Sequence, residues 1–214
     1  TQKVIQFIGT QRSGSNLLRL MLNQHQGISA PHPPHILRTF MSLISQYGDL
    51  KVRKNRFTLV DDVCRWVECN PVEWSLVNFD RDEITDKITS LLDLFEFVYE
   101  QKCVLDQAEI WCCKSTFNIQ YTSELEKVIQ PFYIYLYRDG RDVATSFKKA
   151  YVGPKHIYQI AQKWYQEQME TTSFLSSLAA HRYVRISYEA LIQDPEKVLH
   201  MICEKIGIQF DGIM

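Results

Sequence analysis

The sequence has no apolar run approaching the roughly 18 to 20 residues that a membrane-spanning helix needs, and no surplus of charge. Its 24 basic and 25 acidic side chains nearly cancel over 214 residues, so the surface offers no overall field for a nucleic acid. An anionic ligand must therefore be held by a local cluster. No signal-peptide pattern is present. We expect a cytoplasmic protein, and the missing initiator methionine leaves room for an upstream targeting segment.

The cysteines lack any Cys-x-x-Cys pair, and no histidine follows them at a spacing typical of zinc. Two of them are neighbours in a predicted strand, where successive side chains point to opposite faces. We expect free thiols and no metal site. The six are Cys64, Cys69, Cys103, Cys112, Cys113 and Cys203.

Short apolar runs alternate with segments of helical periodicity along the chain, which is typical of a parallel α/β sheet. The strands expected are residues 4–8, 28–30, 110–113, 132–137 and 182–186, and the main helices are 17–22, 36–47, 118–129, 156–178 and 195–206. Charges interleaved with aromatic and leucine residues predict a helical insertion over about residues 51–107. The length fits a single domain over residues 1–214.

Gly9 and Gly14 stand between the first strand and the first helix at the spacing of a Walker A loop, which aims backbone N–H groups at a phosphate. Walker A requires Lys and then Ser or Thr after the second glycine, whereas Ser15 and Asn16 stand there. The loop's cation is instead Arg12, inside it. This departure disfavours magnesium–ATP chemistry, and a plain tight turn with Arg12 in solvent is the alternative.

A second motif directly follows the strand over residues 132–137 and runs into a helix, from Arg138 to Ser146. Open α/β sheets bind ligands at this carboxyl edge. An arginine fork and a hydroxyl make a suitable clamp for a phosphate. Arg138 could equally form an ion pair with Asp139 or Asp142, and Ser146 could be a solvated helix position.

At these motifs the chain resembles the sulfotransferases that use PAPS (3′-phosphoadenosine 5′-phosphosulfate), with a loop form similar to tyrosylprotein sulfotransferases and bacterial relatives. The resemblance implies a P-loop-NTPase-like parallel sheet and an enzyme that moves the sulfuryl group of PAPS to an acceptor hydroxyl, releasing PAP. It also implies that the first loop binds the 5′-phosphosulfate. The residues concerned are Gln11, Arg12, Ser13, Gly14, Ser15 and Asn16.

The resemblance implies three further roles in binding and catalysis. Arg138 and Ser146 hold the 3′-phosphate, a group that ATP lacks, and Tyr188 contacts the adenine. Lys114 ends a strand within a lysine-containing family motif, so it and Arg12 would stabilise the charge on the leaving group. From position alone, Lys114 could be an exposed loop lysine and Tyr188 a half-buried aromatic residue.

The acceptor hydroxyl needs a base, which in tyrosylprotein sulfotransferases is a glutamate shortly after the second strand. No Asp or Glu precedes Asp49 here, and the matching segment carries His32 and His35 among prolines. Histidine is a suitable base near neutral pH. His32 lies within one position of the family's glutamate and is favoured. Either histidine could instead cap a helix or line the acceptor pocket.

The sequence thus predicts a PAPS-dependent sulfotransferase that needs no metal, acting on a small molecule or on a protein or carbohydrate hydroxyl. The insertion over residues 51–107 is expected on the acceptor side. An ATP-dependent P-loop-like kinase and a non-catalytic nucleotide-binding module are the alternatives. Neither the acceptor nor the oligomeric state follows from the sequence.

Overall fold

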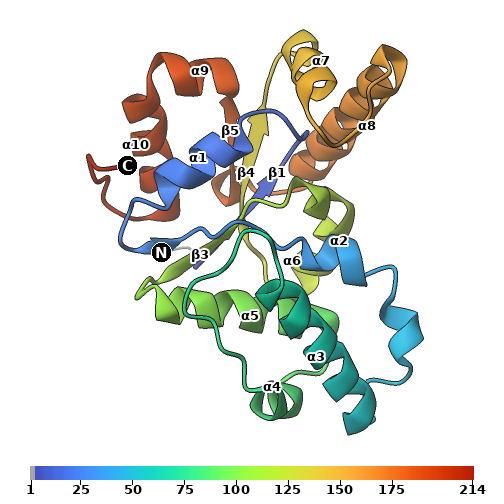
Figure 1. The fold of residues 1–214 in the computed structure, drawn as a ribbon. Coiled ribbons are helices and arrows are strands. Elements are labelled where there is room, and N and C mark those ends of the chain that lie inside the picture. Colours follow the sequence, from blue (N-terminus) through green and yellow to red (C-terminus); the bar gives the residue numbers. More distant parts are fainter. Residues whose placement is uncertain (1–2) are drawn as a thin grey trace.

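A computed structural model describes residues 3–214, and its centre is a five-stranded parallel sheet (Figure 1). The strands are β1 (Val4–Ile8), β2 (Ile28–Ser29), β3 (Ile110–Cys113), β4 (Phe132–Tyr137) and β5 (Tyr183–Ser187). They lie in the order β2-β3-β1-β4-β5, with every neighbouring pair parallel. All five residues of β1 are buried, as expected for a strand covered on both faces. The predicted parallel α/β sheet is confirmed.

One face of the sheet is covered by α1 (Ser15–Leu22), α9 (Tyr188–Gln193) and α10 (Pro195–Ile206), as Figure 1 shows. Leu18 and Leu22 of α1 are fully buried against this face, in one core with Ile5. Helix α10 starts at a proline and ends at Gly207, whose φ of 80° is the left-handed conformation that glycine favours. Both ends of α10 agree with the sequence prediction.

The opposite face is covered by α5 (Leu91–Leu105), α6 (Thr122–Val128) and α8 (Ile157–Ser176). Cys112 belongs to the core under α1 and α10, whereas Cys113 belongs to the core under α5. The predicted alternation along β3 is therefore confirmed. All six cysteines are unpaired. Helix α7 (Gly140–Lys149) packs beside α8.

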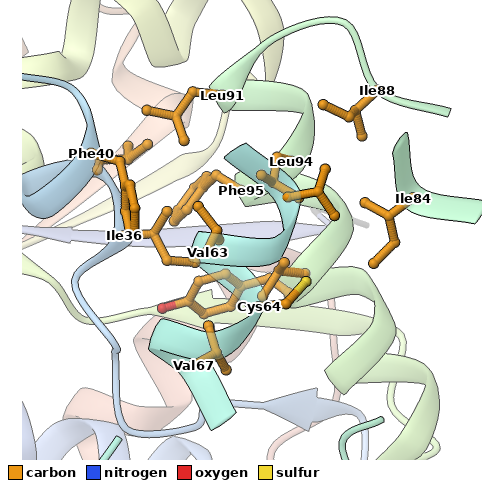
Figure 2. Close-up of a cluster of buried hydrophobic side chains, with 14 of the residues drawn as sticks. Ile36, Phe40, Val63, Cys64, Val67, Ile84, Ile88, Leu91, Leu94 and Phe95 are labelled. Carbon is orange, nitrogen blue, oxygen red and sulfur yellow. The ribbon is translucent and has the colours of Figure 1, made fainter. Parts of the chain in front are cut away.

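The expected helical insertion is present as α3 (Arg53–Glu68), α4 (Arg81–Lys87) and α5, which lie together below the sheet in Figure 1. Its apolar side chains form one core, shown in Figure 2, in which Val63 and Cys64 of α3 face Leu94 and Phe95 of α5. Helix α5 also packs on β3, so the insertion is continuous with the sheet. Among the described helices, none is both long and apolar enough to cross a membrane.

Two predicted helices are partly 3₁₀-helical. The segment predicted as residues 36–47 is α2 (Ile36–Phe40) followed by a 3₁₀ turn at Ile44–Tyr47, and the one predicted as 118–129 is a 3₁₀ segment, Thr116–Tyr121, followed by α6. Residues i and i+3 share a side in both helix types, so apolar periodicity does not separate them.

Candidate active site

The loop of residues 9–15 is a tight left-handed turn between β1 and α1. Gly9 and Gly14 have φ angles of 119° and 92°. A Cβ on Gly9 would lie 2.6 Å from the carbonyl oxygen of Leu136, so only glycine fits. Arg12 has a φ of 71°, which is uncommon for a residue with a side chain. The hydroxyl of Ser13 is buried and has no hydrogen-bond partner in the described part of the chain. This geometry suits the predicted phosphate loop.

Tyr188, at the start of α9, packs on this loop. A Cβ on Gly14 would lie 2.2 Å from Cδ2 of the tyrosine ring, so the ring rests directly against the glycine. The guanidinium carbon of Arg138 lies 4.2 Å from the centroid of the same ring, a cation–π distance. Tyr188 therefore joins the first loop to the end of β4.

Arg12 contacts both Ser146 and Arg138, the two residues of the predicted 3′-phosphate clamp. Arg12 Nε donates to Ser146 Oγ at 2.9 Å, and Arg138 Nη1 donates to the Arg12 carbonyl at 3.4 Å. Arg138 Nε is buried and has no hydrogen-bond partner among residues 3–214. The alternative ion pair is not formed, because Asp139 pairs with Arg141 at 2.6 Å and, within residues 3–214, no carboxylate pairs with Arg138. Its guanidinium is thus available to a ligand.

Lys114 directly follows β3, and the carbonyl groups of the residues on either side of it are held by hydrogen bonds. The side-chain amide of Gln6 donates to the carbonyls of Cys113 and Ser115, each at 3.1 Å. Gln6 Oε1 in turn accepts from Asn118 at 2.9 Å, and both amides are buried. This network holds the lysine backbone rigidly beside β1. Lys114 is half-buried and lines the same pocket as Arg12.

His32 and His35 lie in the loop that follows β2, with ring centroids 6.4 Å apart. The insertion holds this loop through Trp74, whose indole nitrogen donates to the His32 carbonyl at 2.7 Å. Nδ1 of His35 lies 2.8 Å from Ser115 Oγ, whereas Nδ1 of His32 is buried without a partner. His35 precedes α2, but its side chain makes no capping hydrogen bond. The capping alternative therefore does not apply to His35.

These groups share one pocket of about 430 Å³ at the carboxyl edge of the sheet. It is lined by every predicted site residue except Ser13, which is fully buried: Gln11, Arg12, Gly14, Ser15, Asn16, His32, His35, Lys114, Arg138, Ser146 and Tyr188. Leu17, Thr116, Phe147 and Val152 also line it. None of these four was predicted from the sequence, and only Thr116 carried a signal, since it stands in the motif around Lys114. Leu17 of α1 is 40% exposed and faces this pocket.

Three cationic side chains line the pocket, and they and burial shift the pKa values of its titratable groups. Burial and the nearby Lys114 ammonium lower the pKa of His32 to about 4, and burial together with Lys114 and Arg38 lowers the pKa of His35 to about 4. Burial, with Arg19 and Arg12 nearby, also lowers the pKa of Lys114. Both imidazoles are therefore neutral, and able to accept a proton, at neutral pH.

A titration of the imidazole Cε1 protons by NMR would test these values. We expect the His32 and His35 resonances of the ligand-free protein to titrate near pH 4. A bound phosphate ligand adds negative charge and should raise the pKa of both histidines. The unfolded chain binds these protons at higher pH than the folded chain. Stability should therefore fall as pH drops from 6.5 towards 4. Resonances titrating near 6.5, assigned with His32→Gln and His35→Gln, would contradict this.

Gln168 of helix α8 forms hydrogen bonds that stabilise the first loop. Its Nε2 donates to Thr10 Oγ1 at 2.8 Å, and its Oε1 accepts from the hydroxyl of Tyr135. We expect Gln168→Leu to lower the free energy of unfolding by about 1–3 kcal/mol, because it removes the amide that pairs with both the fully buried Thr10 hydroxyl and the Tyr135 hydroxyl. Urea denaturation would measure this. Gln166→Leu, at an exposed position of α8, is the matched control, and an equal effect of both variants would refute a role for Thr10.

The fold is that of a P-loop-like α/β protein whose first loop carries Arg12 and has Ser15 at the position of the Walker lysine. A model of the sulfotransferase family matches residues 5–212. The chain therefore belongs to the sulfotransferase family, and it is an enzyme that transfers a sulfuryl group to an acceptor. The predicted family and reaction are confirmed, and the acceptor is not identified.

Solved structures of similar fold are also sulfotransferases. The sulfotransferase domain from the curacin biosynthetic pathway is 22% identical, with a TM-score of 0.66 over 100% of this chain and 76% of that one. The sulfotransferase domain from the Synechococcus PCC 7002 olefin synthase is 21% identical, with a TM-score of 0.69 over 100% and 75%. STF9 from Mycobacterium avium is 12% identical, with a TM-score of 0.56 over 99% and 65%. These likenesses show the P-loop-like fold. No curated protein sequence matches the chain.

Proposed function

We propose that the sulfuryl donor is PAPS and that the pocket at the end of β1 binds it. The observation that supports this is the charge of the pocket lining, which contains Arg12, Lys114 and Arg138 but no Asp or Glu among the described residues. A cationic pocket without carboxylates fits a ligand with phosphates at both ends. Unpartnered buried donors on Ser13 and Arg138 also fit such a ligand.

Each end of the nucleotide has its own residues in this proposal. The backbone N–H groups of residues 11–16 and the Arg12 side chain bind the 5′-phosphosulfate. Arg138 and Ser146 bind the 3′-phosphate, since Arg138 has no carboxylate partner among the described residues and both side chains line the pocket. Tyr188 supports the Arg138 guanidinium from one side and faces the nucleoside on the pocket side.

Catalysis then combines proton removal with stabilisation of the leaving group. A neutral imidazole, His32 or His35, accepts the acceptor's hydroxyl proton while the hydroxyl oxygen forms a bond to sulfur. The bond between sulfur and the bridging phosphate oxygen breaks, and that oxygen keeps the electron pair in PAP. Lys114 and Arg12 stabilise its negative charge. We further propose that the reaction needs no metal and that the protein is cytoplasmic.

Isothermal titration with PAP and with ATP–Mg²⁺ tests the donor assignment. We expect PAP to bind in the presence of EDTA and ATP–Mg²⁺ to bind far more weakly, because ATP has no 3′-phosphate for Arg138. Tight ATP–Mg²⁺ binding without affinity for PAP would refute the proposal. Turnover of His32→Gln and His35→Gln, measured side by side with radiolabelled PAPS, identifies the base, whose loss should lower kcat by about 10²–10⁴-fold.

A further inference from the structure

A second pocket, of about 480 Å³, lies beside the donor pocket at the β2 edge of the sheet. Its walls come from the end of α1 and the loop after it, from the loop after β2, from residues 72–75 of the insertion, and from the end of α5. His32 lines both pockets, whereas His35 lines only the donor pocket. His32 therefore forms part of the wall between them.

Arg19 is the exceptional side chain of this second pocket. It is only 8% exposed, and its guanidinium donates to two neutral oxygens, Asn16 Oδ1 at 3.1 Å and the Ala30 carbonyl at 2.8 Å. Across residues 3–214, no carboxylate lies within ion-pair distance of it. A buried cation without a counter-charge is costly, and burial lowers the pKa of this arginine.

The other buried cation of the pocket is compensated. Lys102 is 5% exposed and pairs with Asp106, whose second oxygen accepts the Ser29 hydroxyl at 2.6 Å. Asp106 is thus neutralised by its own neighbours. Glu73, the remaining acid of the lining, is exposed. The pocket therefore offers one buried positive charge, that of Arg19, to whatever enters.

We propose that the second pocket binds the acceptor, that the acceptor is a small hydroxycarboxylate, and that its carboxylate pairs with Arg19 while its hydroxyl reaches His32. This rests on the proposed donor function and selects His32 as the base. The hydrogen bond from Trp74 to the His32 carbonyl fixes the shared wall. Since Trp74 belongs to residues 72–75, the insertion builds one side of this acceptor pocket.

Matched probes test the charge preference: 3-hydroxybutyrate, 4-hydroxybutyrate and 4-hydroxybenzoate, each beside its neutral amide. Calorimetry on the PAP-saturated protein should show at least one acid binding about 10-fold or more tightly than its amide, as expected for a charge-assisted hydrogen bond. Arg19→Gln should remove that difference. Equal binding of acid and amide in all three pairs, or no binding of any acid, would overturn the proposal.

A blocking variant tests the location without touching the buried arginine. Ser75 is exposed at the rim of the pocket, so Ser75→Trp should abolish binding of the acid and leave PAP affinity unchanged. Ser176→Trp, at an exposed position at the end of α8, is the matched control. Acid binding that survives Ser75→Trp would place the acceptor elsewhere. Failure of the unmodified protein to bind PAP would instead refute the donor assignment.

Discussion

Lys114→Met should lower kcat for sulfuryl transfer by about 10²–10³-fold, the loss typical when one group that stabilises developing negative charge is removed. The variant keeps an apolar stem of similar length in the half-buried position and removes only the ammonium. Because that charge acts on the bridging oxygen only as the sulfur–oxygen bond breaks, the affinity for PAPS, whose bridging oxygen carries little charge, should change far less than kcat. Single-turnover assays with radiolabelled PAPS would measure the chemical step directly.

The control for this variant is Lys127→Met, at an exposed position near the end of α6. It removes the same charge from the protein at a site away from the pocket lining, and should leave kcat unchanged. Lys114→Arg should recover part of the activity, since it restores a cation. If Lys114→Met lowered PAPS affinity as much as kcat, the lysine would be a ground-state binding group and its assigned role in the chemical step would be wrong.

The clustering of the residues proposed to bind the donor was predictable, because it follows from local patterns and from one rule of sheet topology. Gly9 and Gly14 mark a loop directly after an apolar strand, and Lys114 and Arg138 each stand immediately after another. In the sheet, β3 and β4 flank β1 on either side. The carboxyl ends of these three parallel strands therefore meet at one edge, which brings the two cations to the loop.

The supporting polar contacts could not be predicted, because they join residues far apart in sequence. Gln168 and Thr10 are 158 positions apart, and Gln6 and Asn118 are 112 apart, yet each pair shares a hydrogen bond. The presence of a glutamine in a strand or helix does not indicate which residue its side-chain amide will contact. Only the packing of α8 and of the Thr116–Tyr121 turn against β1 brings them together.

The second pocket could not be predicted from the sequence for a different reason. Arg19 stands in an amphipathic helix, where an arginine between leucines is expected to face solvent. Its burial depends on the loop after β2 and on the insertion, which cover it from outside the helix. The proposed acceptor pocket thus depends on tertiary packing, whereas the proposed donor pocket is formed by residues of local sequence motifs.

Arg138→Met should weaken PAP binding by about 10- to 100-fold, since a hydrogen-bonded charge pair contributes roughly 1.5–3 kcal/mol. AMP, which lacks the 3′-phosphate, should lose far less affinity. The physical reason is that Arg138 has no carboxylate partner in the described structure and so presents its full charge to the phosphate. Calorimetry with both nucleotides on both proteins gives a thermodynamic cycle that isolates the 3′-phosphate contact.

The neighbouring Arg141 supplies the control, because it lies three positions away, is almost fully exposed and is already paired with Asp139. Arg141→Met removes the same charge from the same segment, yet should change PAP affinity little, since its ion pair is screened by solvent. Ser146→Ala combined with Arg138→Met should cost less than the sum of the two single changes, because both groups bind one phosphate. Equal losses for PAP and AMP in Arg138→Met would show that the arginine acts through Tyr188 and the loop, and would refute the 3′-phosphate clamp.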